Sequence, residues 1–121
     1  MKAAYLTEKM KIVVRDDREI PVPSQGQVLV KMEYCGVCGS DVHFYKEGKV
    51  GDTPAPKDFI LGHEVAGTIT ALGEGVTGLQ VGDRVALEPG YTCGKCEFCK
   101  TGRYNLCPDV QFFAAPPVQG A

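Results

Sequence analysis

Four cysteines in the last third of the chain have the spacing C-x2-C-x2-C-x7-C, and they are Cys93, Cys96, Cys99 and Cys107. Almost no aliphatic residues lie between them, so this segment has little apolar surface to order it. Four thiolates at about 2.3 Å bind Zn²⁺ tetrahedrally and leave no open position for water or substrate. The spacing therefore predicts a structural zinc lobe at residues 90–108. Lys95, Lys100 and Arg103 would offset the negative charge of a zinc tetrathiolate.

Two other interpretations of these cysteines stay open. They could be a pair of disulfides or four reduced thiols, and four cysteines also serve an iron–sulfur cluster. The ferredoxin pattern C-x2-C-x2-C-x3-C-P is not matched, although Pro108 follows Cys107. Stoichiometric zinc in a colourless protein would decide between these alternatives.

Cys38 and His63 are a second pair of candidate metal ligands, and each lies beside glycines that let a backbone approach a site closely. A single cysteine and a single histidine this far apart are often core residues. A helix N-terminus at Cys38, however, would lower the pKa of its thiol and favour the thiolate that a metal needs. Glu64 follows His63. Because adjacent side chains of a regular strand point to opposite faces, both reach one metal only at a bend.

Other side chains near Cys38 could also take part in chemistry. Ser40 and His43 lie three residues apart on one face of an expected helix, which would allow a proton path from hydroxyl to imidazole. Cys35 makes a C-x2-C with Cys38, the spacing of a redox pair. Cys35 also ends an apolar strand, so we expect it to be a small buried hydrophobic residue.

The composition fits one ordinary domain, with 121 residues that are 44% hydrophobic and 23% charged, enough to bury a core without disulfides. A net charge of −2 without a basic cluster argues against nucleic acid and anionic membranes as partners. No apolar stretch approaches the roughly 20 residues of a membrane span, and Lys2, Glu8 and Lys9 interrupt any signal-peptide pattern. We therefore expect a cytoplasmic protein, in which cysteines are more often ligands or thiols than disulfides.

Mainly β-strands must position these candidate ligands. Strands are expected at residues 3–7, 11–15, 27–34, 63–72 and 83–87, and the prolines of residues 20–23 predict extended chain. One short helix is expected at residues 40–47, capped by Ser40 and ended by Gly48. Residues 49–59 are expected to be a surface loop, and no periodicity survives beyond Pro89. The lack of crossover helices excludes a parallel α/β sheet and favours a mainly β, barrel-like domain.

Residues 73–78 match G-x-G-x-x-G and follow a strand, as in dinucleotide-binding sites. That fingerprint requires a helix after the glycines, because the helix N-terminus holds the pyrophosphate. Here a short turn-like segment leads into another strand instead. The motif is therefore predicted to be a loop between two strands.

Several motifs in one order carry a family resemblance. They are GVCGSDVH at residues 36–43, GHE at 62–64, VGDRV at 81–85 and the four-cysteine lobe. Through them the sequence resembles the zinc-containing medium-chain dehydrogenases over nearly all of its length. It is most similar to the polyol branch, sorbitol and xylitol dehydrogenases, through DVHFY at 41–45, EPG at 88–90 and GRYNLCPDVQF at 102–112. The resemblance implies that residues 1–121 are a catalytic domain with a GroES-like β-barrel, a short helix and a zinc-binding lobe.

The resemblance also implies a ligand set for a catalytic zinc ion. Cys38 and His63 would be ligands, and Glu64 would bind zinc or stand just outside it. A further glutamate from beyond residue 121, or a zinc-bound water that it holds, would complete the site. Without that partner we expect an occupied structural site in this chain and a weak or empty catalytic one.

Roles in proton transfer and substrate binding follow from the same resemblance. Ser40 would relay the proton of the substrate hydroxyl, and His43 would pass it outward. Phe44 and Tyr45 would line the substrate pocket, and some relatives carry tyrosine in place of Phe44. The implied reaction is the oxidation of a polyol to a ketose with NAD⁺, of the L-iditol or sorbitol 2-dehydrogenase type.

The Rossmann domain that holds NAD⁺ follows the barrel in this family and is absent from the chain. We therefore expect the chain alone to be inactive and the full-length enzyme to be a homotetramer acting on a small-molecule polyol. Two alternatives remain. One is a stand-alone zinc-binding structural or interaction module, and the other is a different branch of the family that acts on simple alcohols, threonine or formaldehyde.

Overall fold

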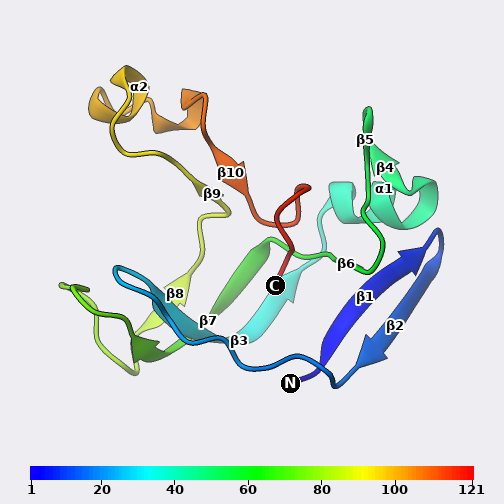
Figure 1. The fold of residues 1–121 in the computed structure, drawn as a ribbon, viewed down its shortest axis with the longest axis horizontal. Coiled ribbons are helices and arrows are strands. Elements are labelled where there is room, and N and C mark those ends of the chain that lie inside the picture. The colour runs from blue at the N-terminus through cyan, green and yellow to red at the C-terminus, as the bar shows by residue number, and fades with distance from the viewer.

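Two antiparallel sheets of three strands each form the body of the molecule (Figure 1). The computed structural model describes residues 1–121. The strands are β1 (Ala3–Glu8), β2 (Lys11–Arg15), β3 (Val28–Gly36), β4 (Lys49–Val50), β5 (Thr53–Pro54), β6 (Phe59–Ile60), β7 (Glu64–Leu72), β8 (Arg84–Ala86), β9 (Gly90–Tyr91) and β10 (Gln111–Phe112). The helices are α1 (Gly39–Glu47), α2 (Glu97–Lys100) and a 3₁₀ turn at Tyr104–Leu106. None of them is long and apolar enough to cross a membrane.

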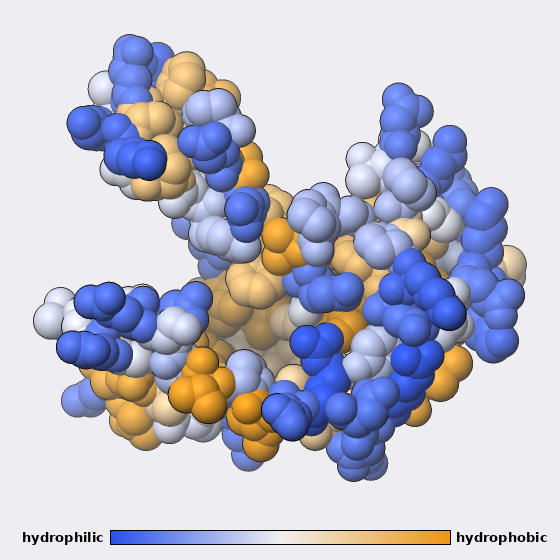
Figure 2. All heavy atoms as spheres, viewed as in Figure 1, coloured by the Kyte–Doolittle hydropathy of each residue, from blue (hydrophilic) through white to orange (hydrophobic).

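The mainly β fold is confirmed, but the two sheets do not join into one closed barrel. Their strand orders are β2-β1-β6 and β3-β7-β8, and no ladder connects one sheet to the other. The strands at one edge of each sheet are short, because β6 has two residues and β8 has three. Figure 2 shows the open centre that results, with apolar side chains lining a hollow. This hollow has a volume of about 1550 Å³.

The strand β7 shows why these segments form sheet. Alternate residues of the strand, Val65, Gly67 and Ile69, are buried, and Ile69 is 1% exposed. This period of two with β-branched residues is typical of a strand that is half buried. Strand β7 pairs with β3 through a register that shifts twice and ends with Gly36 opposite Glu64. The ladder therefore brings the chain just before Cys38 alongside the chain just after His63.

A small apolar core holds helix α1 to the β1–β6 side of the molecule. It consists of Leu6, Phe44, Phe59 and Ala114, all at most 5% exposed. The rings of Phe44 and Phe59 meet edge to face at 5.4 Å, a favoured aromatic arrangement. A half-buried ion pair, Arg15 to Asp58 at 2.8 Å, ties β2 to the segment before β6. Its hydrogen bond lowers the pKa of the Asp58 carboxyl.

The start of α1 differs from the sequence-based expectation. Cys38, and not Ser40, is the N-cap residue, and the carboxylate of Asp41 accepts a hydrogen bond from the Cys38 backbone N–H at 3.0 Å. This arrangement is a capping box in which the residue at position N3 reaches back to the cap. The expected end is confirmed, because Gly48 has φ of 74° and its N–H bonds to the Phe44 carbonyl oxygen.

Other expectations need correction. Residues 49–59 are not a plain loop, because they contain the β4–β5 hairpin and the beginning of β6. The region beyond Pro89 contains the β9–β10 pair, helix α2 and a 3₁₀ turn. These elements are two to four residues long, too short for any periodic pattern to show in the sequence. Cys35 is exposed and not buried, because it lines the open hollow.

The glycine motif at residues 73–78 is confirmed as a connection between β7 and β8. Its first glycine has a packing reason: the N–H of Gly73 donates to the Gln27 carbonyl oxygen at 2.8 Å. A Cβ atom on Gly73 would collide with the carbonyl oxygen of Ser24. The glycine thus allows two backbones to approach, which is the structural use of glycine at such sites.

Replacing Gly73 with alanine should therefore destabilise the domain. Because the obstacle is backbone, relief requires a shift of the 24–27 turn, and we expect a loss of about 1–3 kcal/mol in the free energy of unfolding. Urea unfolding monitored by circular dichroism measures it. Gly39→Ala is the matched control, since a Cβ there meets nothing within 4 Å. Equal midpoints for the two variants would contradict this explanation.

Candidate metal centres

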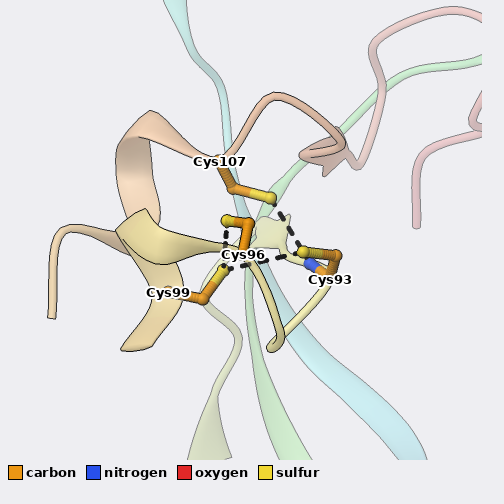
Figure 3. A group of neighbouring side chains, drawn as sticks. All are labelled: Cys93, Cys96, Cys99 and Cys107. Atoms are coloured by element: carbon orange, nitrogen blue, oxygen red, sulfur yellow. Dashed lines mark hydrogen bonds between the residues drawn. The ribbon is translucent and has the colours of Figure 1, made fainter. Parts of the chain in front are cut away.

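The four cysteines of the lobe turn their sulfurs toward one another (Figure 3). All four Sγ atoms lie within 4.8 Å of one another. The Cys96–Cys99 pair is 3.4 Å apart and the Cys93–Cys99 pair 4.0 Å. Tetrahedral zinc with sulfurs at about 2.3 Å requires S···S separations of about 3.8 Å. A disulfide needs about 2.05 Å, and all six cysteines of the chain are free. These separations fit a single tetrahedral ion.

The groups around this cluster favour ionised sulfur at Cys93 and Cys99, whereas burial and the neighbouring sulfurs raise the pKa of the Cys96 thiol to about 11. The N–H groups of Lys95 and Cys96 lower the pKa of the Cys93 thiol to about 6. The Thr92 hydroxyl is the largest cause of a lowered pKa at Cys99. Thiolate, not thiol, is the metal ligand. The lowered pKa values of Cys93 and Cys99 therefore favour the binding of a cation.

Little else holds the lobe together. Figure 1 shows α2, β9 and β10 projecting away from the two sheets. Of the four cysteines only Cys107 is buried. The other contacts include a two-residue pairing of β9 with β10, a hydrogen bond from the Tyr91 hydroxyl to Gln111 at 2.6 Å, and Arg103 over the ring of Phe98. A segment with so few contacts is expected to depend on a metal for its order.

A second donor cluster lies where the β3–α1 connection meets the start of β7. The side-chain donor atoms of Cys38, His63 and Glu64 lie within 4.8 Å of one another. The expected bend is present, because Gly62, just before His63, has φ of 98°. The adjacent side chains of His63 and Glu64 can therefore approach one point. Gly36 makes room for the carboxylate, since a Cβ on Gly36 would collide with Glu64 Oε2.

His63 itself has an unmet bonding requirement. The residue is 9% exposed, and its Nδ1 atom is buried without a hydrogen-bond partner. Buried polar atoms are rarely left in this state in folded proteins. One carboxylate oxygen of Asp41 lies 3.7 Å from it, close enough to orient a ring that binds a metal. The donor set of thiolate, imidazole and carboxylate is the one that zinc takes in proteins, so the residues fit this ion.

Asp41 is a site residue that the sequence analysis did not assign. It is 7% exposed, and its two oxygens accept hydrogen bonds from the Cys38 N–H at 3.0 Å and the Gly62 N–H at 3.3 Å. One carboxylate thus joins the two segments that carry Cys38 and His63. Its position three residues after the N-cap was the signal in the sequence, because acidic residues at N3 complete capping boxes.

The variant Asp41→Asn should weaken both folding and metal binding. An amide has one acceptor oxygen, so one of the two N–H groups loses its partner, at about 1–3 kcal/mol. Loss of such an outer partner commonly lowers metal affinity 10–100-fold. Urea unfolding and competitive zinc titration measure these effects. Asp52→Asn, at the exposed tip of the β4–β5 hairpin, should change neither. If Asp41→Asn also changes neither, the bridging role is wrong.

A cavity of about 270 Å³ opens beside His63. Its lining residues come from α1, the β4–β5 hairpin, the approach to β7 and the chain around β10, and they are Ser40, Phe44, Val50, Thr53, His63, Phe112, Ala114, Ala115 and Pro116. The predicted site residues Ser40 and Phe44 are therefore next to His63. Tyr45 is not among these residues, and it lines the larger hollow instead. His43 faces solvent, with its Nδ1 3.3 Å from Glu47 Oε1.

Several cavity residues escaped the sequence analysis. Val50 and Thr53 are directly paired across the β4–β5 hairpin, so both belong to one face of it. Phe112 packs on the ring of His63 with centroids 5.7 Å apart. These residues lie in segments without periodicity, and nothing in the sequence indicated that they meet.

Comparisons with known proteins identify the family of the chain. The alcohol dehydrogenase GroES-like domain family matches residues 24–121. A sorbitol dehydrogenase from Bacillus subtilis is 54% identical over 100% of this chain and 34% of its own length. A probable D-xylulose reductase A from Arthroderma otae is 47% identical over 97% of this chain and 33% of its own. The chain thus spans about a third of the length of these curated relatives.

A solved structure shows the same fold. The alcohol dehydrogenase from Thermus sp. ATN1 superimposes with a TM-score of 0.87 at 32% sequence identity. The match covers 100% of this chain and 35% of that one. Sequence and structure comparisons therefore agree on the family and on the extent of the match.

Proposed function

Because the chain belongs to the alcohol dehydrogenase GroES-like domain family, we propose that it is the zinc-binding catalytic part of an NAD-dependent polyol dehydrogenase. The reaction is oxidation of a secondary hydroxyl of a sorbitol- or xylitol-type polyol to a ketose. One observation carries the proposal. His63 of the Cys38–His63–Glu64 cluster lines a cavity that Ser40 also lines, and none of the four lobe cysteines lines it.

The two clusters would have different tasks. Cys93, Cys96, Cys99 and Cys107 would hold a structural zinc ion with a closed ligand shell. Cys38 and His63, with Glu64 beside them, would hold a catalytic one. The chemistry that a zinc ion supplies there is Lewis acidity, which lowers the pKa of a substrate hydroxyl. The hydride acceptor is the nicotinamide of NAD⁺, held by a Rossmann domain outside residues 1–121.

The chain's own residues would bind, orient and deprotonate the substrate. Ser40 lies in the cavity beside His63 and would take the hydroxyl proton, while the carbon loses hydride to NAD⁺. The proton would leave by way of His43, one helical turn further on and paired with Glu47 at the surface. Phe44 and Phe112 would exclude water from the reacting atoms. Asp41 would keep Cys38 and His63 at a fixed separation.

A polyol substrate is supported by the names of the relatives, a sorbitol dehydrogenase and a probable D-xylulose reductase. The cavity offers side-chain hydroxyls at Ser40 and Thr53 to a substrate with several hydroxyl groups. Tyr45 would contact substrate only from the larger hollow. A cytoplasmic homotetramer remains our proposal for the full-length enzyme.

Two alternatives are weaker. A stand-alone zinc module would need the four-cysteine lobe but has no use for a buried His63 whose Nδ1 lacks a partner. The alcohol dehydrogenase from Thermus sp. ATN1 shares the fold, which keeps simple alcohols as the second candidate substrate class.

A chimera tests the proposal. Residues 1–121 replace the matching third of the Bacillus subtilis sorbitol dehydrogenase, and the initial rate of NADH formation is measured with sorbitol, xylitol and 2-propanol. We expect kcat/KM for the polyols to exceed that for 2-propanol at least tenfold, and the isolated chain to show no turnover. A folded, zinc-loaded chimera that prefers 2-propanol or oxidises none of the three would contradict the proposal.

A further inference from the structure

We propose that residues 119–121 are a positioning segment for the metal ligand His63, with Gln119 as its most important side chain. The inference rests on the proposed metal site at Cys38 and His63. The contacts come from residues that lie more than fifty positions from His63 in the sequence. The contacts are backbone hydrogen bonds and one side-chain hydrogen bond to the chain immediately before His63.

The segment pairs with residues 60–62 like a short added strand. The N–H of Gly120 donates to the Ile60 carbonyl oxygen at 2.7 Å, and the N–H of Ala121 donates to the Gly62 carbonyl oxygen at 3.0 Å. The Ile60 N–H donates to Oε1 of Gln119 at 2.7 Å. Ile60 also pairs with Tyr5 of β1. The chain leading to His63 is therefore paired with β1 and with the 119–121 segment.

One of these hydrogen bonds is made to the peptide group between Gly62 and His63. Asp41 accepts a hydrogen bond from the Gly62 N–H, and Ala121 donates one to the Gly62 carbonyl. Both peptide groups of Gly62 are thus fixed, from α1 on one side and from the 119–121 segment on the other. Gly62 has φ of 98°, and glycine has more backbone freedom than any other residue. Without these two hydrogen bonds the residue before the ligand would be free to move.

The contact is also sterically tight. A Cβ on Gly120 would meet the carbonyl oxygen of Ile60 at 2.6 Å and would also collide with that of Leu61. A Cβ on Gly62 would lie 2.8 Å from Cys35 Sγ and 3.3 Å from the Ala121 carbonyl oxygen. A shift of this segment is therefore transmitted directly to residues 60–62. Metal ligands must be held within about 0.5 Å of their working positions, so such a shift would be felt as lost metal affinity.

The test measures metal binding and needs no turnover. In the chimera described above, the four-cysteine site is kept filled with zinc and the second site is emptied. Cobalt(II) is then titrated into it, followed by the visible absorption of cysteine-bound cobalt. Gln119→Ala should raise the cobalt dissociation constant about tenfold or more, the range seen for outer-shell partners. Gln119→Glu keeps an acceptor oxygen and should stay within about twofold of the parent.

Gln27→Ala is the matched control, because Gln27 Oε1 likewise accepts a backbone N–H, that of Ser24 at 3.1 Å, but far from His63. It should leave cobalt binding unchanged. If Gln119→Ala does not fold, Gln119→Asn, whose oxygen is one methylene short, carries the same expectation. A lowered melting temperature with unchanged cobalt affinity would show a merely structural role and overturn the inference. If the parent chimera takes no cobalt at the second site, the proposed metal site itself is wrong.

Discussion

Cys93→Ser is expected to lose the zinc ion proposed for the lobe and to unfold residues 90–108, while the two sheets keep their structure. The sulfurs of the four cysteines already converge at the separations that one tetrahedral ion requires. Apart from them the lobe has a two-residue strand pair, helix α2 of four residues and a 3₁₀ turn of three. Structural zinc contributes on the order of 10 kcal/mol to folding in small domains, far more than these contacts. The ion is therefore expected to be the main source of order.

Elemental analysis and amide hydrogen exchange measure this effect together. We expect zinc at the lobe to fall from one per chain to near zero, and protection to vanish in residues 91–107 but not in β3 or β7. Cys35→Ser is the control, because Cys35 belongs to neither cluster, and it should keep its zinc. Retention of stoichiometric zinc and of amide protection by Cys93→Ser would show that the cluster is not the metal site.

Cys38→Ser has the opposite pattern, with a large loss of activity and little loss of structure. The sheets and the small core do not depend on Cys38, whose thiol is only partly buried. Without it the second cluster keeps only His63 and Glu64 as ligands from residues 1–121 and loses its one thiolate, so zinc would be held weakly. Loss of Lewis-acid assistance removes several kcal/mol of transition-state stabilisation. A loss of about 4 kcal/mol is about a thousandfold in rate.

The chimera is again the protein to measure. Cys38→Ser and His63→Asn should each lower kcat/KM for sorbitol about a thousandfold or more and reduce the zinc content from two per chain to one. Melting temperatures should change by only a few degrees. His43→Asn should lower the rate far less, because its side chain is at the surface beside Glu47. Near-normal rates in the Cys38 and His63 variants would place the chemistry elsewhere.

The sequence was most informative where chemistry itself dictates geometry. The spacing of Cys93, Cys96, Cys99 and Cys107 predicted a cluster whose sulfurs do converge, because a metal site needs particular atoms close together. The pairing of Cys38 with His63 was also anticipated, and the register that places Gly36 of β3 opposite Glu64 of β7 explains it. The metal ions and the role of each ligand stay predictions.

The remaining features depend on tertiary contacts that no local pattern records. Ser40 looked like the helix cap, yet the Asp41 carboxylate selects Cys38 because it also holds the Gly62 N–H. The cavity combines Thr53 from a two-residue strand with Phe112 from another, and short strands carry no periodicity. Cys35 was expected to be buried, but that would require the two sheets to close over the hollow it lines.

X-ray diffraction at the zinc absorption edge, from crystals of the chimera grown without added metal, is the most direct test of the two-site account. Two zinc sites predict two anomalous peaks in the part contributed by this chain. One should lie among Cys93, Cys96, Cys99 and Cys107, and the other between Cys38 Sγ and the His63 imidazole. A catalytically active crystal form with no anomalous peak between Cys38 and His63 would contradict a catalytic zinc ion at these residues.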